Sequence, residues 1–263
     1  MPDTLCDRAC AVLNAPEPDE KVRLTREAAR AWKDGVCTSI GKASLPARPG
    51  RPAHPILTAP SHMPKRSAGG PKGRIGLLHA LAHIELNAID LSWDIIVRFT
   101  GEDLPRAFYD DWVEVATDEA EHFAMLAEQL VAEGAAYGDL PAHDGLWEAA
   151  EKTSDDLLAR LALVPMVLEA RGLDTTPKTV EKLRRQGETA SADILEHIAE
   201  EEIPHVAAGV RWFETVCDKR GLEPIATFRT LIAERHPSGL KPPFNIPARD
   251  RAGMAPGYYE QIN

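Results

Sequence analysis

Two Glu-x-x-His motifs, each preceded at a similar distance by a single glutamate, are the feature that most constrains the fold of this chain. In chain order, the six residues are Glu85, Glu119, His122, Glu169, Glu202 and His205. The first single glutamate precedes its motif by 34 residues and the second by 33. Four-helix bundles use this order of ligands to hold two metal ions in their core. The order therefore predicts a helical bundle with a carboxylate-bridged metal pair.

The spacing within each motif suits metal binding. Residues three apart lie on one face of a helix, so Glu119 and His122 could reach the same ion. Mixed imidazole and carboxylate ligands favour iron, with manganese as the alternative. Four carboxylates also balance the charge of two divalent ions, whereas four like charges in a metal-free core would be costly. In the competing interpretation, Glu119 and Glu202 are exposed neighbours of other acidic residues.

Apolar periodicity predicts an all-α protein. A proline- and glycine-rich arm separates two short N-terminal helices from four longer helical regions, and a proline-rich C-terminal tail follows. The expected helical regions are about 3–14, 18–34, 74–99, 105–134, 146–172 and 176–220, with a break near Gly187 in the last. In this arrangement Glu85 and Glu119 belong to one helical hairpin, and Glu169 and Glu202 belong to another. Pro165 and Pro204 should bend the helices next to the proposed ligands.

Length and composition are compatible with one large core and appendages, because 263 residues of which 44% are hydrophobic can bury much apolar surface. We expect three parts: N-terminal helices and arm at 1–72, the metal-binding bundle at 73–235, and the tail at 236–263. No apolar run is long enough to cross a membrane. The first residues do not resemble an export signal, and the four cysteines form no Cys-x-x-Cys pair, so we expect a cytoplasmic protein with reduced thiols.

The arm is basic although the chain as a whole carries a net charge of −11. From Gly35 through Ile84 there is no Asp or Glu. In one interpretation the arm wraps the acidic body through mixed apolar and charge contacts. In the other, four cations border the site entrance and attract an anionic substrate, which would be RNA or a small metabolite. These four candidate substrate-binding residues are Arg48, Arg51, Lys65 and Arg66.

Two further histidines, His79 and His83, lie one helical turn apart near Glu85. Their offsets from Glu85 put them on other faces of the same helix. We therefore expect them to pack against the arm, or to support the metal ligands from behind, rather than to bind metal. Asn87 and Asp90 lie closer to the His83 face and are candidate hydrogen-bond partners for it.

Three segments carry a resemblance to a known family. They are His79-Ala80-Leu81-Ala82-His83-Ile84-Glu85-Leu86-Asn87-Ala88-Ile89-Asp90, Pro141-Ala142-His143-Asp144-Gly145-Leu146-Trp147 and Leu168-Glu169-Ala170-Arg171-Gly172-Leu173-Asp174. These motifs resemble an uncharacterised ferritin-like family, known as a domain of unknown function. The resemblance covers nearly the whole chain and implies a ferritin-like four-helix bundle with a metal site at the six residues above. More distantly, the ligand order resembles that of ferritin-like tRNA-modifying monooxygenases, and manganese catalases and rubrerythrins use similar ligand sets.

These observations favour a non-haem di-iron oxidoreductase that activates O₂ as an oxidase or monooxygenase. The alternatives are a dimanganese catalase or peroxidase, an iron-storage protein and a non-catalytic metal-binding protein. An oxygenase would also need an electron donor. The sequence leaves open the substrate, the reaction, the redox partner and the oligomeric state.

Overall fold

The computed structural model describes residues 4–63 and 70–260, and in these ranges the chain is all-α. Two isolated β-bridges join single residues, and neither belongs to a strand. The chain divides into two compact units, Met1–Glu148 and Ala149–Asn263. The predicted all-α class is confirmed, whereas the predicted domain boundaries remain predictions. None of the described helices is long and apolar enough to span a membrane.

The N-terminal helices of the first unit follow the local signals in the sequence. Helix α1 (Leu5–Asn14) begins with a capping box, in which the side chain of Thr4 accepts from the Asp7 amide and the Asp7 carboxylate accepts from the Thr4 amide. Helix α2 (Pro18–Lys33) begins at a proline, whose missing N–H costs nothing in a first turn. Both helices agree closely with the predicted ranges.

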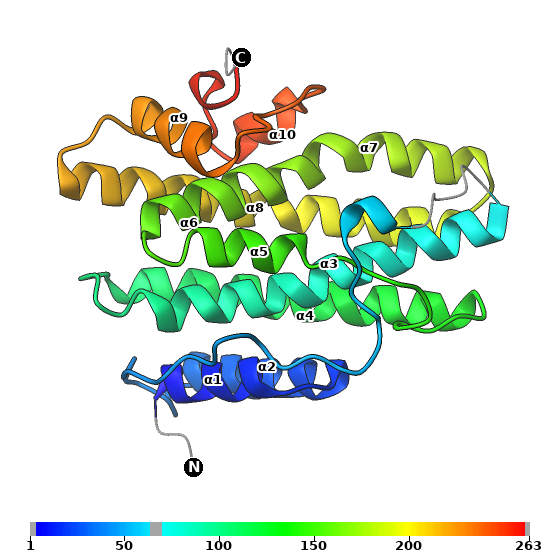
Figure 1. The fold of residues 1–263 in the computed structure, drawn as a ribbon, viewed down its shortest axis with the longest axis horizontal. Helices are drawn as coiled ribbons and strands as arrows, with labels where there is room; N and C mark the ends of the chain where they lie inside the picture. The colour runs from blue at the N-terminus through cyan, green and yellow to red at the C-terminus, as the bar shows by residue number, and fades with distance from the viewer. Residues whose placement is uncertain (1–3, 64–69, 261–263) are drawn as a thin grey trace. The chain divides into compact units, whose positions relative to one another are not determined.

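Two long helices, α3 (Gly70–Arg98) and α4 (Arg106–Ala132), pack along each other in the first unit and form a helical hairpin (Figure 1). Helices α1 and α2 pack against this pair. Helix α3 is buried almost continuously from Leu78 to Val97, and its buried residues include carboxylates. In its described part, the arm that precedes α3 contains a short 3₁₀ turn, η1 (Pro60–His62), and pairs with another loop at the bridge between Leu57 and Ala142.

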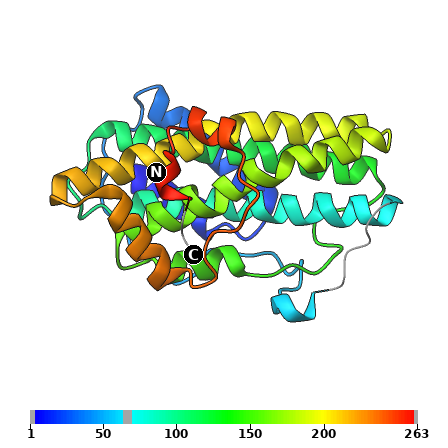
Figure 2. The same cartoon turned by 90° about the horizontal axis from the view of Figure 1, so that it is seen from above.

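The second unit contains α6 (Leu157–Leu163), the π-helical turn η2 (Val164–Glu169), α7 (Ala170–Arg185) and α8 (Thr189–Arg220). Helices α7 and α8 pack side by side, as both views show (Figures 1 and 2). The predicted break near Gly187 is confirmed, because this glycine has a φ of 80° and lies between α7 and α8. Helix α9 (Pro224–Arg235), α10 (Ile246–Arg251) and the 3₁₀ turn η3 (Pro256–Tyr258) complete the unit.

The expected continuous helix at 146–172 begins as predicted, but it is interrupted after Lys152 and extends beyond Gly172. Helix α5 (Gly145–Lys152) stops early, and Asp156 then caps α6 through the amide of Leu158. The buried guanidinium of Arg160 donates to the Thr153 hydroxyl and the Ala150 carbonyl, and these bonds stabilise the break.

At its other end the helix continues through Gly172 and Pro177 as α7. A proline inside a helix leaves the carbonyl four residues earlier without its usual donor. Here the side-chain amide of Asn245 donates to that carbonyl, on Leu173, at 3.0 Å. A residue distant in sequence therefore compensates for Pro177, and local pattern alone could not predict this continuation.

Candidate metal centre

The first half of the predicted metal centre is assembled within the first unit. Glu85 lies on α3, whereas Glu119 and His122 lie on α4, one helical turn apart. The three residues each offer a ligand atom, and these atoms lie within 4.8 Å of one another. The Nδ1 atom of His122 is 3.8 Å from a Glu85 oxygen and 3.5 Å from a Glu119 oxygen. This buried group of one imidazole and two carboxylates could hold a metal ion.

All three side chains are buried, and Glu119 and His122 are completely inaccessible to solvent. Burial alone lowers the pKa of the His122 imidazole, but hydrogen bonds and charge from Glu119 and Glu85 outweigh it and raise the pKa to about 11. Without metal, the imidazole therefore carries a proton between two acidic side chains. A metal ion must displace that proton from Nδ1 to bind there, so metal affinity should fall as the pH falls.

The second half of the predicted centre belongs to the second unit. Glu169 ends the π-helical turn η2, and Glu202 and His205 lie on α8. His205 Nδ1 is 3.5 Å from a Glu202 oxygen, with the His205 side chain 2% and the Glu202 side chain 12% exposed. The i, i+3 geometry that the sequence predicted is thus present in both motifs, and neither glutamate is an exposed surface residue. π-Helical turns often occur at functional sites, because the extra residue redirects side chains.

The helices of the second half-site approach each other closely at Gly209, one turn after His205 on α8. A Cβ atom at Gly209 would lie 2.5 Å from Pro165 Cβ and 2.6 Å from its Cγ. The proline ring is fused to the backbone of η2 and cannot rotate away. The absence of a side chain at Gly209 therefore allows α8 to pack against the turn that carries Glu169.

We expect the substitution Gly209→Ala to push η2 away from α8. Such overpacking destabilises a core by about 1–3 kcal/mol, even though alanine favours helix more than glycine does. Urea unfolding would measure the change. Gly172→Ala is the matched control, because a Cβ there meets no atom within 4 Å. If Gly209→Ala were as stable as this control, the close approach would not matter.

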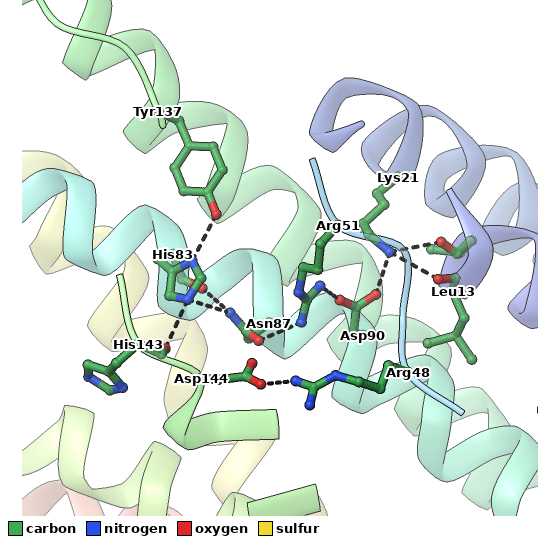
Figure 3. A network of polar contacts seen from close by, with 11 residues as sticks. Leu13, Lys21, Arg48, Arg51, His83, Asn87, Asp90, Tyr137, His143 and Asp144 are labelled. Atoms are coloured by element: carbon green, nitrogen blue, oxygen red, sulfur yellow. Dashed lines mark hydrogen bonds and ion pairs between the residues drawn. The ribbon is translucent and has the colours of Figure 1, made fainter. Parts of the chain in front are cut away.

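A buried polar network ties the N-terminal region to α3 (Figure 3). The Lys21 ammonium donates to Asp90 at 2.7 Å and to the carbonyls of Val12 and Leu13, and both Lys21 and Asp90 are completely buried. Arg51, from the arm, also pairs with Asp90 and donates to Asn87. Sequence analysis did not identify Lys21, because its only signal is a lysine on an amphipathic helix.

The network continues from Asn87 to His83. The side-chain amide of Asn87 lies 3.2 Å from His83 Nε2, which also lies 3.1 Å from the carbonyl of His143. This carbonyl can only accept, so Nε2 carries the proton and His83 Nδ1 accepts from the Tyr137 hydroxyl at 2.8 Å. Burial lowers the pKa of His83 to about 4. His83 is therefore neutral and hydrogen-bonds to Tyr137 and to the His143 carbonyl. Of its two expected partners, Asn87 contacts it. Asp90 instead pairs with Lys21 and Arg51.

Of the four candidate substrate-binding residues in the arm, two can be placed. Arg51 forms the buried contacts described above, and Arg48 pairs with Asp144. Lys65 and Arg66 lie outside the described residues. The two observed ion pairs are of the kind expected for an arm that wraps the body, and a role for the arm in substrate binding stays a prediction.

Comparison with known proteins places the chain in a family. The model of a family described as "Protein of unknown function (DUF455)" matches residues 14–260, and the chain therefore belongs to this family. An uncharacterized protein of Haemophilus influenzae is 43% identical over 210 residues, which cover 77% of this chain and 72% of that protein. No solved structure matches the chain.

Proposed function

We propose that this member of the DUF455 family is a ferritin-like dimetal-carboxylate oxidoreductase that activates O₂ to oxidise a substrate. The observation that carries the proposal is the buried group of Glu85, Glu119 and His122, whose ligand atoms lie within 4.8 Å of one another. One protonated imidazole can balance only one of the two buried carboxylates, and desolvation penalises the remaining charge, so a bound metal cation would stabilise the group.

The donor set fits a hard or borderline metal ion such as iron or manganese. It provides imidazole nitrogen and carboxylate oxygen, and thiolate plays no part. The second Glu-x-x-His motif offers the same pair of donors at 3.5 Å, and Glu169 precedes it as Glu85 precedes the first. The ligand order therefore supports a single centre with two ions in a four-helix bundle. When bound, a pair of redox-active ions supplies the electrons and the Lewis acidity that reduction of O₂ requires.

The protein's own residues would set the conditions of the reaction. Glu85, Glu169 and the two Glu-x-x-His motifs would hold the ions. The buried, apolar surroundings of α3 and α4 exclude water from the first half-site, since Leu86, Ile89 and Leu126 are completely inaccessible. Exclusion of water strengthens electrostatic interactions at the site and protects reactive species from side reactions.

Metal analysis of the protein purified from its own host, followed by anaerobic reduction and exposure to O₂, tests this function. We expect about two iron ions per chain, as in other two-metal centres, and O₂ consumption that depends on the reductant. Rapid O₂ release from peroxide without a reductant would instead indicate a catalase. Retention of many iron atoms per chain would indicate storage, and a metal-free protein that cannot be loaded would contradict the proposal.

A further inference from the structure

A cavity of about 190 Å³ lies in the second unit beside the turn that carries Glu169. Val167 and Leu168, the two residues before Glu169 in η2, line it, and Leu240 and Phe244 contribute further apolar surface from the connection between α9 and α10. At roughly 30 Å³ per water molecule, the cavity has room for about six waters. Drug-sized ligands need about 300–1,000 Å³. The cavity therefore suits a small molecule with an apolar part.

The charged side chains around this cavity have a positive balance. Arg249 is buried and donates to both oxygens of Asp174, at 3.0 and 2.7 Å, so these two charges compensate each other. Arg171 and Lys241 also line the cavity, and Arg171 lies 3.7 Å from the already paired Asp174. The cavity wall therefore has two more positive than negative charges, although the net charge of the chain is −11.

Arg171 is held in place by hydrogen bonds from one of its guanidinium nitrogens, and its other donors are available. Its Nη1 atom donates to the carbonyls of Lys241 at 2.7 Å and Pro243 at 3.2 Å, which fixes the connection between α9 and α10 against the start of α7. Among the described residues, no other atom of this guanidinium makes a hydrogen bond. The Nε and Nη2 donors therefore remain available, and arginine donors in this fork match the two oxygens of a carboxylate.

The remaining polar groups of the cavity are uncharged near neutral pH. Burial lowers the pKa of His236, so this imidazole is neutral. Its Nε2 atom lies 3.0 Å from the hydroxyl of Ser238, which can donate to it. These groups add polarity to one part of the wall without offsetting the two cations.

We propose that this cavity binds a small organic carboxylate. Its head group would contact Arg171 and Lys241, and its hydrocarbon part would pack against Leu168 and Leu240. We assign this carboxylate as the substrate of the metal-dependent reaction, and this assignment rests on the proposed function. The ligand would lie against the two residues that directly precede Glu169, so the same π-helical turn would contact the substrate and supply a metal ligand.

Calorimetric titration of the metal-free, full-length protein with hexanoate, and with 1-hexanol as its neutral counterpart, tests the cavity. We expect saturable binding of hexanoate and much weaker binding of hexanol. Because hydrogen bonds to charged groups contribute strongly to binding, Arg171→Gln should raise the Kd for hexanoate about tenfold or more. Arg171→Lys should restore only part of the lost affinity. Lys241→Gln should raise Kd about threefold, as expected for an exposed charge. Lys178→Gln, an exposed lysine of α7 outside the cavity, should leave Kd unchanged.

Several outcomes would overturn the inference. Equal affinity for hexanol and hexanoate, or a Kd that neither Arg171→Gln nor Lys241→Gln changes in folded protein, would show that the cations do not select the ligand. Inorganic phosphate that competes as well as hexanoate would indicate a general anion site. Metal-loaded protein without any hexanoate binding would refute the substrate assignment alone. If the protein bound hexanoate but could not be loaded with metal, the proposed function and the substrate role would both be refuted. The cavity would still be a carboxylate-binding site.

Discussion

Replacing Glu119 by alanine is expected to reduce the bound metal from about two ions to less than one per chain, because in the proposed centre both half-sites would hold one pair of ions. Glu119 is completely buried beside His122, so its loss would remove one of the proposed ligands from the buried group. Glu202→Ala should have the same effect from the second motif. Metal content per chain, measured after loading with excess Fe(II) and desalting under anaerobic conditions, would give the result.

The chain provides matched controls for both variants. Glu121 lies two residues from Glu119, but its carboxylate pairs with Arg26 on the surface, about half exposed. Glu201, next to Glu202, pairs with the exposed His197. Glu121→Ala and Glu201→Ala should therefore retain the full metal content. If these controls lost as much metal as Glu119→Ala and Glu202→Ala, the effect would come from helix stability rather than from ligation.

Replacing Asp90 by alanine should lower the free energy of unfolding by about 3–5 kcal/mol, as expected when one partner of a buried ion pair is removed. Lys21 would remain in a site with no exposed surface. Burial already lowers the pKa of this ammonium against the opposing influence of Asp90. Arg51 would also lose a partner, and with it one of the contacts that join the arm to α3. Chemical denaturation of the variant and the parent protein would measure the loss.

Two comparisons make this second prediction specific. Glu20→Ala removes an exposed partner of Arg23 on the same helix as Lys21 and should cost much less stability than Asp90→Ala. The double substitution Lys21→Met and Asp90→Leu should recover much of the lost stability, because replacing a buried ion pair by apolar groups is often nearly neutral. A single Asp90→Ala variant as stable as Glu20→Ala would show that the network contributes little to the fold.

Features that depend on neighbouring residues in the sequence were predicted well. The helix start at Pro18 and the break at Gly187 each act through their own backbone, so their effects can be recognised locally. The i, i+3 spacing of both Glu-x-x-His motifs likewise follows from helix geometry, and the structure shows each pair with its donor atoms 3.5 Å apart.

Features that depend on distant partners were missed. One helix was expected to end at Gly172 and the next to begin near Thr176, but Asn245 donates to the carbonyl that Pro177 leaves without a donor, and α7 continues. Lys21 resembles an ordinary surface lysine until α3 brings Asp90 to it, 69 residues away in sequence. The π-helical form of η2 was also unexpected, although Pro165 marked the position of an irregular helix. For Pro177 and Lys21 the deciding interaction is tertiary.

The most direct test of the central claim is X-ray absorption spectroscopy on the iron-loaded protein. A single centre formed by the six residues predicts nitrogen and oxygen neighbours for every ion, no sulfur, and metal–metal scattering at about 3.5–4 Å. Two ions per chain with that metal–metal signal would support the account. Isolated ions without a metal neighbour, or ions bound by sulfur, would contradict it.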